Sequence, residues 1–551
     1  MRYRTARRCA AGWVSVALGL ALLIAPPASA ETRTIDGSGN NRDNPDWGRA
    51  DMPLRRVAPS AYPGDGSGET IRTWPNPRSI SNAIVDQGGA ATPNVRGMSN
   101  LIWQWGQFLD HDISLTPHDA ANGAAPIPVP DPNDPLAPGP IPLTRSDYVA
   151  DQGRQQVNVL TNWIDASQVY GSDGAHAASL RAFERGRLRT GANNLLPPAP
   201  DGSGMLAGDE RVNEQIGLTA MHTVFMREHN RLADAIATRA PQLDDEAVYQ
   251  AARRVVGAEM QHITYDEFLP ALMGDDAPHA ADYQYDPTID PRINNSFSTA
   301  LFRFGHSLVP DQLALTDARG RTVETLQLHE AFFAAEMLRQ DPERVDDMLR
   351  GLAAHPASEL DAKVVDGMRN FLFGGPGRGG MDLAAINIQR GRDHGLPDYN
   401  TLREAYGLSP VGSFRDITSD AAIRDALAAT YGDVDQIDPW IGALAEDHRP
   451  GSSLGELLTA ALRDQFTRLR DGDRFFFADD ALLREVPIAE VIDVESVRLA
   501  DVIERNTSIE GLPENVFFVR GAGAQVIPAP SAVAGGLALL GVLVLRRRGG
   551  W

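Results

Sequence analysis

Helical periodicity is the sequence feature that most constrains the fold of this chain. Apolar residues recur every three or four positions from Met98 to Leu109, the spacing of one face of an amphipathic helix. The same spacing predicts further helices over 214–238, 246–263, 326–341, 343–354, 395–407 and 453–470. The chain shows no βαβ alternation, no run of alternating strands and no fixed repeat. We therefore predict an all-α fold, with one large domain, long loops and little β structure.

The predicted connections between these helices are long. Residues 31–95 are rich in Gly, Pro, Asn and Asp, which indicates an irregular arm. Eight prolines lie between Pro126 and Pro142, so the segment 117–143 can be neither a helix nor a central strand. Loops of this length are usually functional, and we expect an ordered loop or insertion here.

The two ends resemble targeting segments rather than parts of the fold. Residues 1–30 combine four arginines, a short apolar core and a final Ala-Ser-Ala, which is typical of a cleaved export signal. Residues 521–551 contain a proline motif, an apolar run over 531–545 and three arginines, and resemble the PEP-CTERM sorting tails of exported bacterial proteins. A permanent short anchor is the alternative. We predict boundaries at 1–30, 31–520 and 521–551, and an extracellular or envelope-associated protein.

Composition excludes several classes of function. Lys and Arg number 51 against 73 Asp and Glu, a net charge of −22, so we expect no nucleic-acid partner. The only cysteine, Cys9, lies in the predicted leader, which excludes disulfides, thiol catalysis and thiolate metal sites from the exported chain. The sequence has no HExxH motif, P-loop or G-x-S-x-G motif.

Three histidines lie in unusual surroundings. His111 stands one helical turn after Gln107 on an otherwise apolar helix, so a polar cluster would face a buried site. His306 follows two aromatic residues and a glycine. His394 lies in a polar and charged segment, 387–394, where a core helix would be apolar. Taken singly, each is equally well explained as a structural histidine.

In this order the three contexts resemble those of the animal-type haem peroxidases, the peroxidase–cyclooxygenase superfamily to which myeloperoxidase, lactoperoxidase and peroxidasin belong. Further shared motifs extend the resemblance from about Thr34 to Val519. They are Val169-Tyr170-Gly171-Ser172, Met221-His222-Thr223, the run Arg227 to Ala233 and the run Leu469 to Phe476. The resemblance implies the helical haem peroxidase fold, haem b as cofactor and an enzyme that reduces hydrogen peroxide.

The resemblance also implies roles around the haem. His306 corresponds to the axial ligand of the haem iron, and Asn387 to the acceptor for its other ring nitrogen. Arg303 and Arg390 correspond to the partners of the haem propionates, because a guanidinium pairs well with a carboxylate. For these two arginines an ordinary ion pair is the alternative.

On the opposite, distal side the resemblance implies five further roles. His111 corresponds to the base that moves the peroxide proton, and Arg211 to the cation that stabilises charge as the O–O bond breaks. Gln107 corresponds to the residue that holds the distal water or halide. Asp110 and Glu214 match the carboxylates that form ester links to haem in mammalian members, although Glu214 also suits the first turn of a helix.

One departure from the family bears on the donor. Gln215 stands where myeloperoxidase has the methionine that forms a third covalent link to haem. Without that link we expect oxidation of bromide, iodide, thiocyanate or small organic donors such as phenols rather than of chloride.

A calcium site also follows from the resemblance. Every second position from 161 to 167 carries a candidate ligand: Thr161, Trp163, Asp165 and Ser167. In an extended segment these side chains would point the same way. They resemble the family's calcium loop, to which Asp112 adds a carboxylate. Carboxylates, hydroxyls and main-chain carbonyls form the all-oxygen set that Ca²⁺ prefers. An ordinary polar turn is the alternative.

Two other functions remain open. A fatty-acid dioxygenase of the cyclooxygenase-related branch would need a tyrosine three residues before the axial histidine, where this chain has Arg303, and would lack the distal Arg211. A non-catalytic haem-binding envelope protein would have no use for a complete distal set. The oligomeric state, the natural donor and the source of peroxide are not indicated by the sequence.

Overall fold

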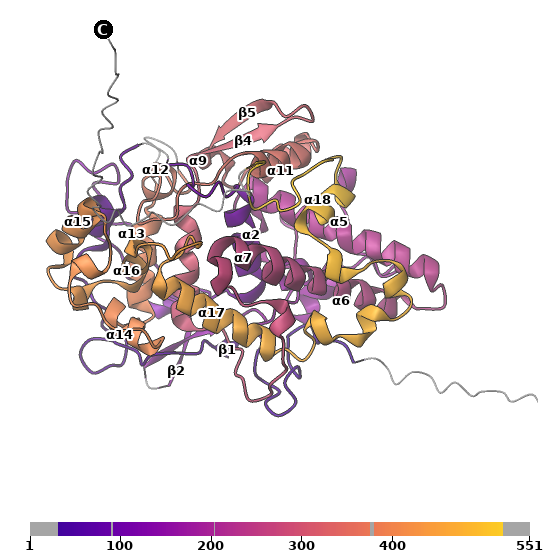
Figure 1. Ribbon diagram of the computed structural model, residues 1–551, viewed down its shortest axis with the longest axis horizontal. Coiled ribbons are helices and arrows are strands. Elements are labelled where there is room, and N and C mark those ends of the chain that lie inside the picture. Colours follow the sequence, from indigo (N-terminus) through magenta and orange to yellow (C-terminus); the bar gives the residue numbers. More distant parts are fainter. Residues whose placement is uncertain (1–30, 90–91, 152, 203, 375–379, 522–551) are drawn as a thin grey trace, which may run out of the picture. The chain divides into compact units, whose positions relative to one another are not determined.

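Helices dominate the described part of the chain, as Figure 1 shows for the computed structural model. The structure describes residues 31–89, 92–151, 153–202, 204–374 and 380–521. The predicted export signal and, apart from Gly521, the predicted tail lie outside the described residues. Within these residues, no helix combines the length and the apolar character needed to cross a membrane.

The α-helices are α1 (Pro77–Ile80), α2 (Leu101–Ile113), α3 (Ser167–Tyr170), α4 (Gly174–Leu180), α5 (Ile216–Arg239), α6 (Asp245–Ile263), α7 (Leu269–Met273), α8 (Asn295–Thr299), α9 (Leu328–Ala331), α10 (Ala335–Gln340), α11 (Arg344–Ala354), α12 (Asp366–Arg369), α13 (Leu383–Asp393), α14 (Tyr399–Ala405), α15 (Ala421–Tyr431), α16 (Pro439–Ala445), α17 (Glu456–Asp471) and α18 (Leu499–Asn506). The strands are β1 (Met52–Pro53), β2 (Tyr148–Ala150), β3 (Arg154–Asn158), β4 (Gln312–Thr316) and β5 (Thr322–Gln327). Shorter helical segments that matter below are η4 (Glu210–Asn213), η5 (Thr264–Phe268), η7 (Ala280–Asp282), η8 (Leu301–Ser307) and η11 (Phe477–Asp479). The all-α prediction is confirmed.

The apolar face of α2 lies at the centre of the core. Leu101, Trp105 and Phe108 are fully buried. The rings of Trp105 and Phe108 contact Phe225 of α5 at centroid distances of 5.8 and 4.9 Å. Each such buried side chain contributes about 1.5–3 kcal/mol to the stability of the fold. Helix α2 also packs against α3, α11 and η8, so the polar residues on its other side are held on a rigid element.

Strands form only two small antiparallel sheets, with the orders β1-β3-β2 and β4-β5. Helix α11 packs on β4, and at Gly351 a side chain would lie 1.7 Å from the carbonyl oxygen of Ala314. The predicted helix over 326–341 is wrong: β5 occupies its start, and α9 and α10 are separated by 332–334. Phe333 has a φ of 54°, which a right-handed helix does not accommodate.

The other predicted helices are present, with shifted ends. The largest change is over 395–407, which is helical only as α14. The residue at 397 is a proline, and the residue before a proline is disfavoured in a helix.

The proline-rich loop 117–143 is an ordered structure that rests on α13. Ile127 and Ile141 exchange backbone hydrogen bonds at 2.9 Å and pack on Ala385 of α13. Within the loop, Asp134 forms a buried ion pair with Arg78 at 2.8 Å. The loop therefore lies against the helix that carries Asn387 and Arg390.

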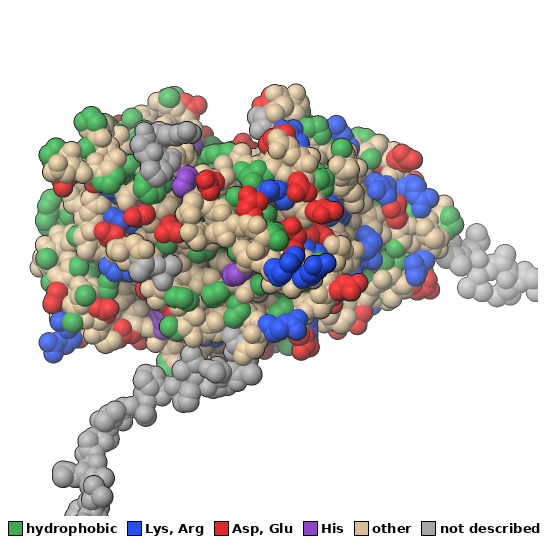
Figure 2. Space-filling model, turned by 90° about the horizontal axis from the view of Figure 1, so that it is seen from above, with side chains coloured by type: hydrophobic (Ala, Val, Ile, Leu, Met, Phe, Trp, Pro, Cys, Tyr) green, Lys and Arg blue, Asp and Glu red, His purple; other side chains and the backbone are tan. Residues whose placement is uncertain are grey.

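The surface carries both signs of charge. Figure 2 shows acidic and basic side chains next to one another on the face in view. Exposed pairs such as Arg321–Asp317 and Arg484–Glu495, both at 2.6 Å, contribute little each, because water screens them. The stability of the fold thus comes mainly from its apolar core.

Candidate functional site

Helix α2 and the segment before α5 bring five predicted residues together on the distal side. The Gln107 side-chain nitrogen donates to Oε2 of Glu214 at 3.0 Å, and Arg211 donates to Oδ2 of Asp110 at 3.5 Å. The Nε2 atom of His111 lies 3.9 Å from Oε2 of Glu214. An amide, two carboxyls, a guanidinium and an imidazole therefore line one space.

Asp209 is the residue that the sequence analysis missed. It is the N-cap of η4, and its Oδ1 accepts the backbone N–H of Arg211 at 2.8 Å. Its carboxylate also accepts Nε and Nη2 of Arg211, at 2.9 and 2.8 Å, and lies 3.6 Å from Nδ1 of His111. The signal available in the sequence is a capping aspartate two residues before the arginine.

This carboxylate fixes the charge of the distal arginine. Burial opposes both charges, but Arg211 holds the pKa of Asp209 well below its usual value, and Asp209 raises the pKa of Arg211. A two-point guanidinium–carboxylate pair also fixes the orientation of both groups. Arg211 is therefore a permanent, positioned cation.

His111 is held in its neutral form. The side chain is 3% exposed, and burial together with the charge of Arg211 lowers its pKa well below the usual value. Its Nδ1 is buried without a hydrogen-bond partner among the described residues. A neutral imidazole beside a fixed cation is able to accept a proton.

Two carboxyls face an internal space. Burial raises the pKa of Asp110 to about 6 and that of Glu214 to about 7, although Arg211 opposes both shifts. Their side chains are nevertheless 32% and 31% exposed. The surrounding protein therefore desolvates both carboxyls, although about a third of each side chain stays uncovered.

Segment η8 packs against α2, and its Arg303 acts electrostatically on Asp110. Its His306 is partly exposed, and burial lowers its pKa to about 3, so the imidazole is neutral. Its Nε2 has no hydrogen-bond partner in the described part of the chain, and a side chain added at Gly305 would meet nothing within 4 Å. A neutral imidazole whose second nitrogen makes no hydrogen bond could hold haem iron.

The structure pairs His306 with Asn387, but in the opposite direction to our expectation. The Asn387 amide nitrogen donates to Nδ1 of His306 at 2.8 Å. The amide oxygen accepts Nη1 of Arg303 at 3.1 Å, and because a guanidinium can only donate, this bond orients the amide.

Arg303 and Arg390 differ in their surroundings. Arg303 also donates to the carbonyl of Ser298 and has no carboxylate within ion-pair distance among the described residues. Burial, together with Arg390 and Arg211, lowers its pKa to about 10. Arg390 is paired with Asp393 at 3.1 Å. The space therefore has excess positive charge near Arg303.

These features fit haem. Neutral His306 and His111 supply a ligand nitrogen and a base, and Arg303 supplies a cation that a propionate would neutralise. Asp110 and Glu214 supply two carboxyls that each keep about a third of their surface exposed.

The predicted calcium residues form a second buried cluster. Ser167 donates its backbone N–H and its hydroxyl to the side-chain and main-chain oxygens of Asp112, at 2.5 and 2.6 Å. Thr161 donates to Asp165 at 3.0 Å. Burial raises the pKa of both aspartates, and the charge of Asp165 raises that of Asp112 further. The indole of Trp163 donates to the carbonyl of residue 37 at 2.9 Å, which leaves its own carbonyl as its only possible ligand atom.

This cluster differs from the predicted calcium loop in two ways. Residues 162–165 form bends rather than the predicted extended segment, and Ser167 begins α3. In the described part of the chain, no three His, Cys, Asp or Glu side chains are grouped to hold a metal. A cation here would need hydroxyl and carbonyl oxygens beside the two carboxylates.

Comparison with known proteins identifies the family. Residues 32–517 match the model of the animal haem peroxidase family. The chain is 35% identical to peroxidasin of Drosophila melanogaster (88% of this chain, 36% of that protein) and 33% identical to peroxinectin A of Dictyostelium discoideum (90% and 97%). It is 35% identical to lactoperoxidase of Mesocricetus auratus (88% and 77%). The chain thus spans about a third of peroxidasin but nearly all of peroxinectin A.

Solved structures agree. Peroxidase A from Dictyostelium discoideum has a TM-score of 0.81 at 33% identity, covering 89% of this chain and 100% of that one. A fatty acid alpha-dioxygenase from Arabidopsis thaliana has a TM-score of 0.77 at 20% identity, covering 89% and 83%, which shows the shared fold alone. The chain belongs to the animal haem peroxidase family. The predictions of this family, and of a haem-dependent oxidoreductase, are confirmed.

Proposed function

We propose that this protein reduces hydrogen peroxide on the distal side of the haem, with His111 and Arg211 as its catalytic residues. The observation that carries the proposal is a neutral His111 beside a cation that Asp209 fixes in place. Haem, when bound, would supply the redox-active iron and the electrons that the donor replaces. His111 takes a proton from the first peroxide oxygen and gives it to the departing one. Arg211 stabilises the developing negative charge, which is commonly worth about 3 kcal/mol.

His306 is the proposed axial ligand. Pairing of Arg303 with a haem propionate would free the Asn387 oxygen to accept the Nδ1 proton, which leaves Nε2 of His306 for iron. Arg390 is proposed as a second propionate partner, since its charge acts on Arg303, and Gln107 as the residue that holds the distal water or halide.

The proposed donors are bromide, iodide, thiocyanate and small phenols. Gln215 donates to Gln104 and Gln107 at 2.5 and 3.2 Å, so an amide network occupies the place of the sulfur link. Asp110 and Glu214 are proposed ester links to haem. Acid–butanone extraction should leave the haem on the protein, and bromination should exceed chlorination near neutral pH. Extractable haem would contradict the ester links, and equal rates for both halides would contradict the proposed donors.

A calcium ion at Asp112 and Asp165 is proposed on the strength of two buried, mutually repelling carboxylates. Chelation should lower the melting temperature and change the haem spectrum together, because Asp112 is next to His111. Metal analysis that finds no calcium in active protein would defeat the proposal. Export and association with the cell envelope are also proposed, on the predicted terminal segments alone.

The test of the function is peroxide-dependent oxidation of guaiacol by the purified holoprotein. The same preparation should not incorporate molecular oxygen into a fatty acid, because Arg303 stands where a dioxygenase would need its tyrosine. Oxygen uptake with fatty acid but no guaiacol oxidation would favour the dioxygenase. Haem binding without either activity would favour a non-catalytic haem protein.

A further inference from the structure

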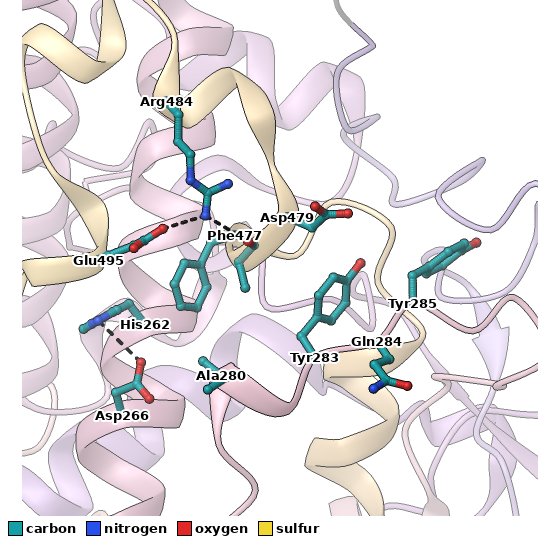
Figure 3. A pocket seen from close by; sticks show the side chains of 12 residues that line it. His262, Asp266, Ala280, Tyr283, Gln284, Tyr285, Phe477, Asp479, Arg484 and Glu495 are labelled. Carbon is teal, nitrogen blue, oxygen red and sulfur yellow. Dashed lines mark hydrogen bonds and ion pairs between the residues drawn. The ribbon is translucent and has the colours of Figure 1, made fainter.

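A solvent-open cavity is lined by residues between His262 and Glu495, none of which belongs to the distal cluster. Its volume is about 690 Å³, and Figure 3 shows it between the end of α6, the loop after η7 and the segment that begins at η11. Tyr283 and Tyr285 of the loop line one side, and Phe477 lies opposite. Both tyrosines are partly exposed. The cavity therefore offers aromatic surface to a molecule that reaches it from solvent.

The charge of this cavity is on balance acidic. Arg484 is neutralised by Glu495 at 2.6 Å, and Asp266 lies 3.4 Å from the ring of His262. Asp479 has no ion-pair partner among the described residues, and Figure 3 shows its carboxylate on the rim near the tyrosines. The cavity thus favours neutral or cationic molecules over anions.

A continuous row of aromatic rings leads from this cavity to η8. Tyr283 stacks on Phe476 at 4.9 Å, and Phe476 meets the edge of Tyr265 at 5.3 Å. Tyr265 contacts Phe466 at 6.2 Å, and Phe466 contacts Phe302 at 5.8 Å. These centroid distances are those of packed aromatic pairs. Electron tunnelling is faster through packed atoms than across gaps. The row of rings in contact is therefore a suitable path for electrons.

The row ends on η8, the segment that carries the proposed iron ligand. Phe302 belongs to η8, four residues before His306. The rings come from η5, the loop after η7, η8, α17 and the residue before η11, and together they connect the cavity to η8.

The two tyrosines of the row differ in what oxidation would require. Tyr265 is fully buried and donates to the carbonyl of Phe466 at 2.7 Å, so its proton has no base to go to. Tyr283 donates to the carbonyl of Asp473 at 2.9 Å but is partly exposed to the cavity, where water can take its proton. Tyr283 is therefore the residue of the row suited to lose an electron and a proton, and Tyr265 to bridge.

We propose that this cavity is a second donor site, at which a neutral or cationic phenol too large for the distal space passes electrons through Tyr283 and the ring row toward the haem. The proposal rests on the proposed peroxidase function. Each donor molecule breaks its O–H bond, loses one electron to the row and one proton to water, and leaves as a phenoxyl radical. Two donors supply two electrons, which with two protons reduce hydrogen peroxide, whose O–O bond breaks, to two waters.

The test compares a carrier-bound phenol with a small one. Dextran carrying tyramine cannot enter the distal space, whereas guaiacol and bromide can. Tyr283→Phe should lower kcat for the dextran-bound phenol by about tenfold or more and leave guaiacol and bromide oxidation unchanged. Tyr283→Trp, which keeps an oxidisable ring, should restore most of the rate. Tyr285→Phe in the same cavity and Tyr249→Phe outside the row are matched controls.

A spectroscopic readout separates electron transfer from binding. With peroxide and no donor, the wild type should show a tyrosyl radical by electron paramagnetic resonance, and a spin trap should label Tyr283. Tyr283→Phe should lose that labelled peptide, and Tyr285→Phe should keep the signal. Full oxidation of the dextran-bound phenol by Tyr283→Phe overturns the proposal. If the wild-type holoprotein does not oxidise guaiacol at all, the proposed peroxidase function is overturned instead.

Discussion

The two walls of the haem site hold their arginines in different ways. On the distal wall, Arg211 is fixed by a two-point ion pair with Asp209. On the opposite wall, the Arg303 guanidinium hydrogen-bonds, among the described residues, only to the carbonyl of Ser298 and the Asn387 oxygen. The cation proposed to act during the reaction is thus positioned in advance, whereas the cation proposed to bind the cofactor is left for the cofactor's own carboxylates.

The largest expected effect is on the proximal wall. His306→Ala should lose haem or retain it without imidazole ligation, because Nε2 of His306 has no hydrogen-bond partner among the described residues and is the proposed ligand of the iron. The optical spectrum measures this directly. The exposed His118→Ala is the matched control and should keep the wild-type spectrum. An unchanged spectrum in His306→Ala would place the iron elsewhere.

On the distal wall, His111→Ala or Arg211→Ala should bind haem but react with peroxide about 100-fold more slowly or worse, the usual loss when an acid–base group or a charge stabiliser is removed. Stopped-flow mixing with peroxide measures the rate. Rates near that of the wild type would show that these residues have no part in the reaction.

The variant Asp209→Asn tests whether the ion pair with Asp209 is what positions Arg211. The amide keeps the shape of the side chain but removes the charge that orients Arg211, so we expect a loss of about tenfold, or ~1.4 kcal/mol, smaller than that of Arg211→Ala. The haem spectrum should be unchanged. A loss as large as that of Arg211→Ala would mean that the ion pair, rather than the cation, is what matters.

The smallest effect concerns stability in the haem-free protein. The pKa of Glu214 is raised to about 7, so the folded state binds its proton more tightly than the unfolded state does. Ionisation then destabilises the fold as pH rises from about 4.5 to about 7. Glu214→Gln should remove this part of the pH dependence in urea unfolding. An unaltered profile would mean that Glu214 does not face an enclosed space.

Much of this could be predicted from the sequence, for reasons that differ between regions. Long helices such as α5 and α6 follow from the 3.6-residue apolar period, and the site histidines stand in distinctive local contexts. Asp209 was missed because it acts through Arg211, and only the folded distances show the pairing. The helix expected over 326–341 failed because tertiary contacts, including β5, override local periodicity. The ring row was invisible, since its members contact one another only after folding.

The way in which the proline-rich loop is closed has a consequence for the environments in which the protein can work. Arg78 joins Asp134 of the loop to Asp382 at the start of α13, so an ionic clasp does here what a disulfide does in many exported proteins. Although burial opposes it, the hydrogen bonds from Arg78 hold the pKa of Asp134 below its usual value. Reducing agents should therefore leave this fold intact. Acid should open the Asp382 half of the clasp before the Asp134 half, because burial raises the pKa of Asp382. Export and folding would then need no oxidising partner.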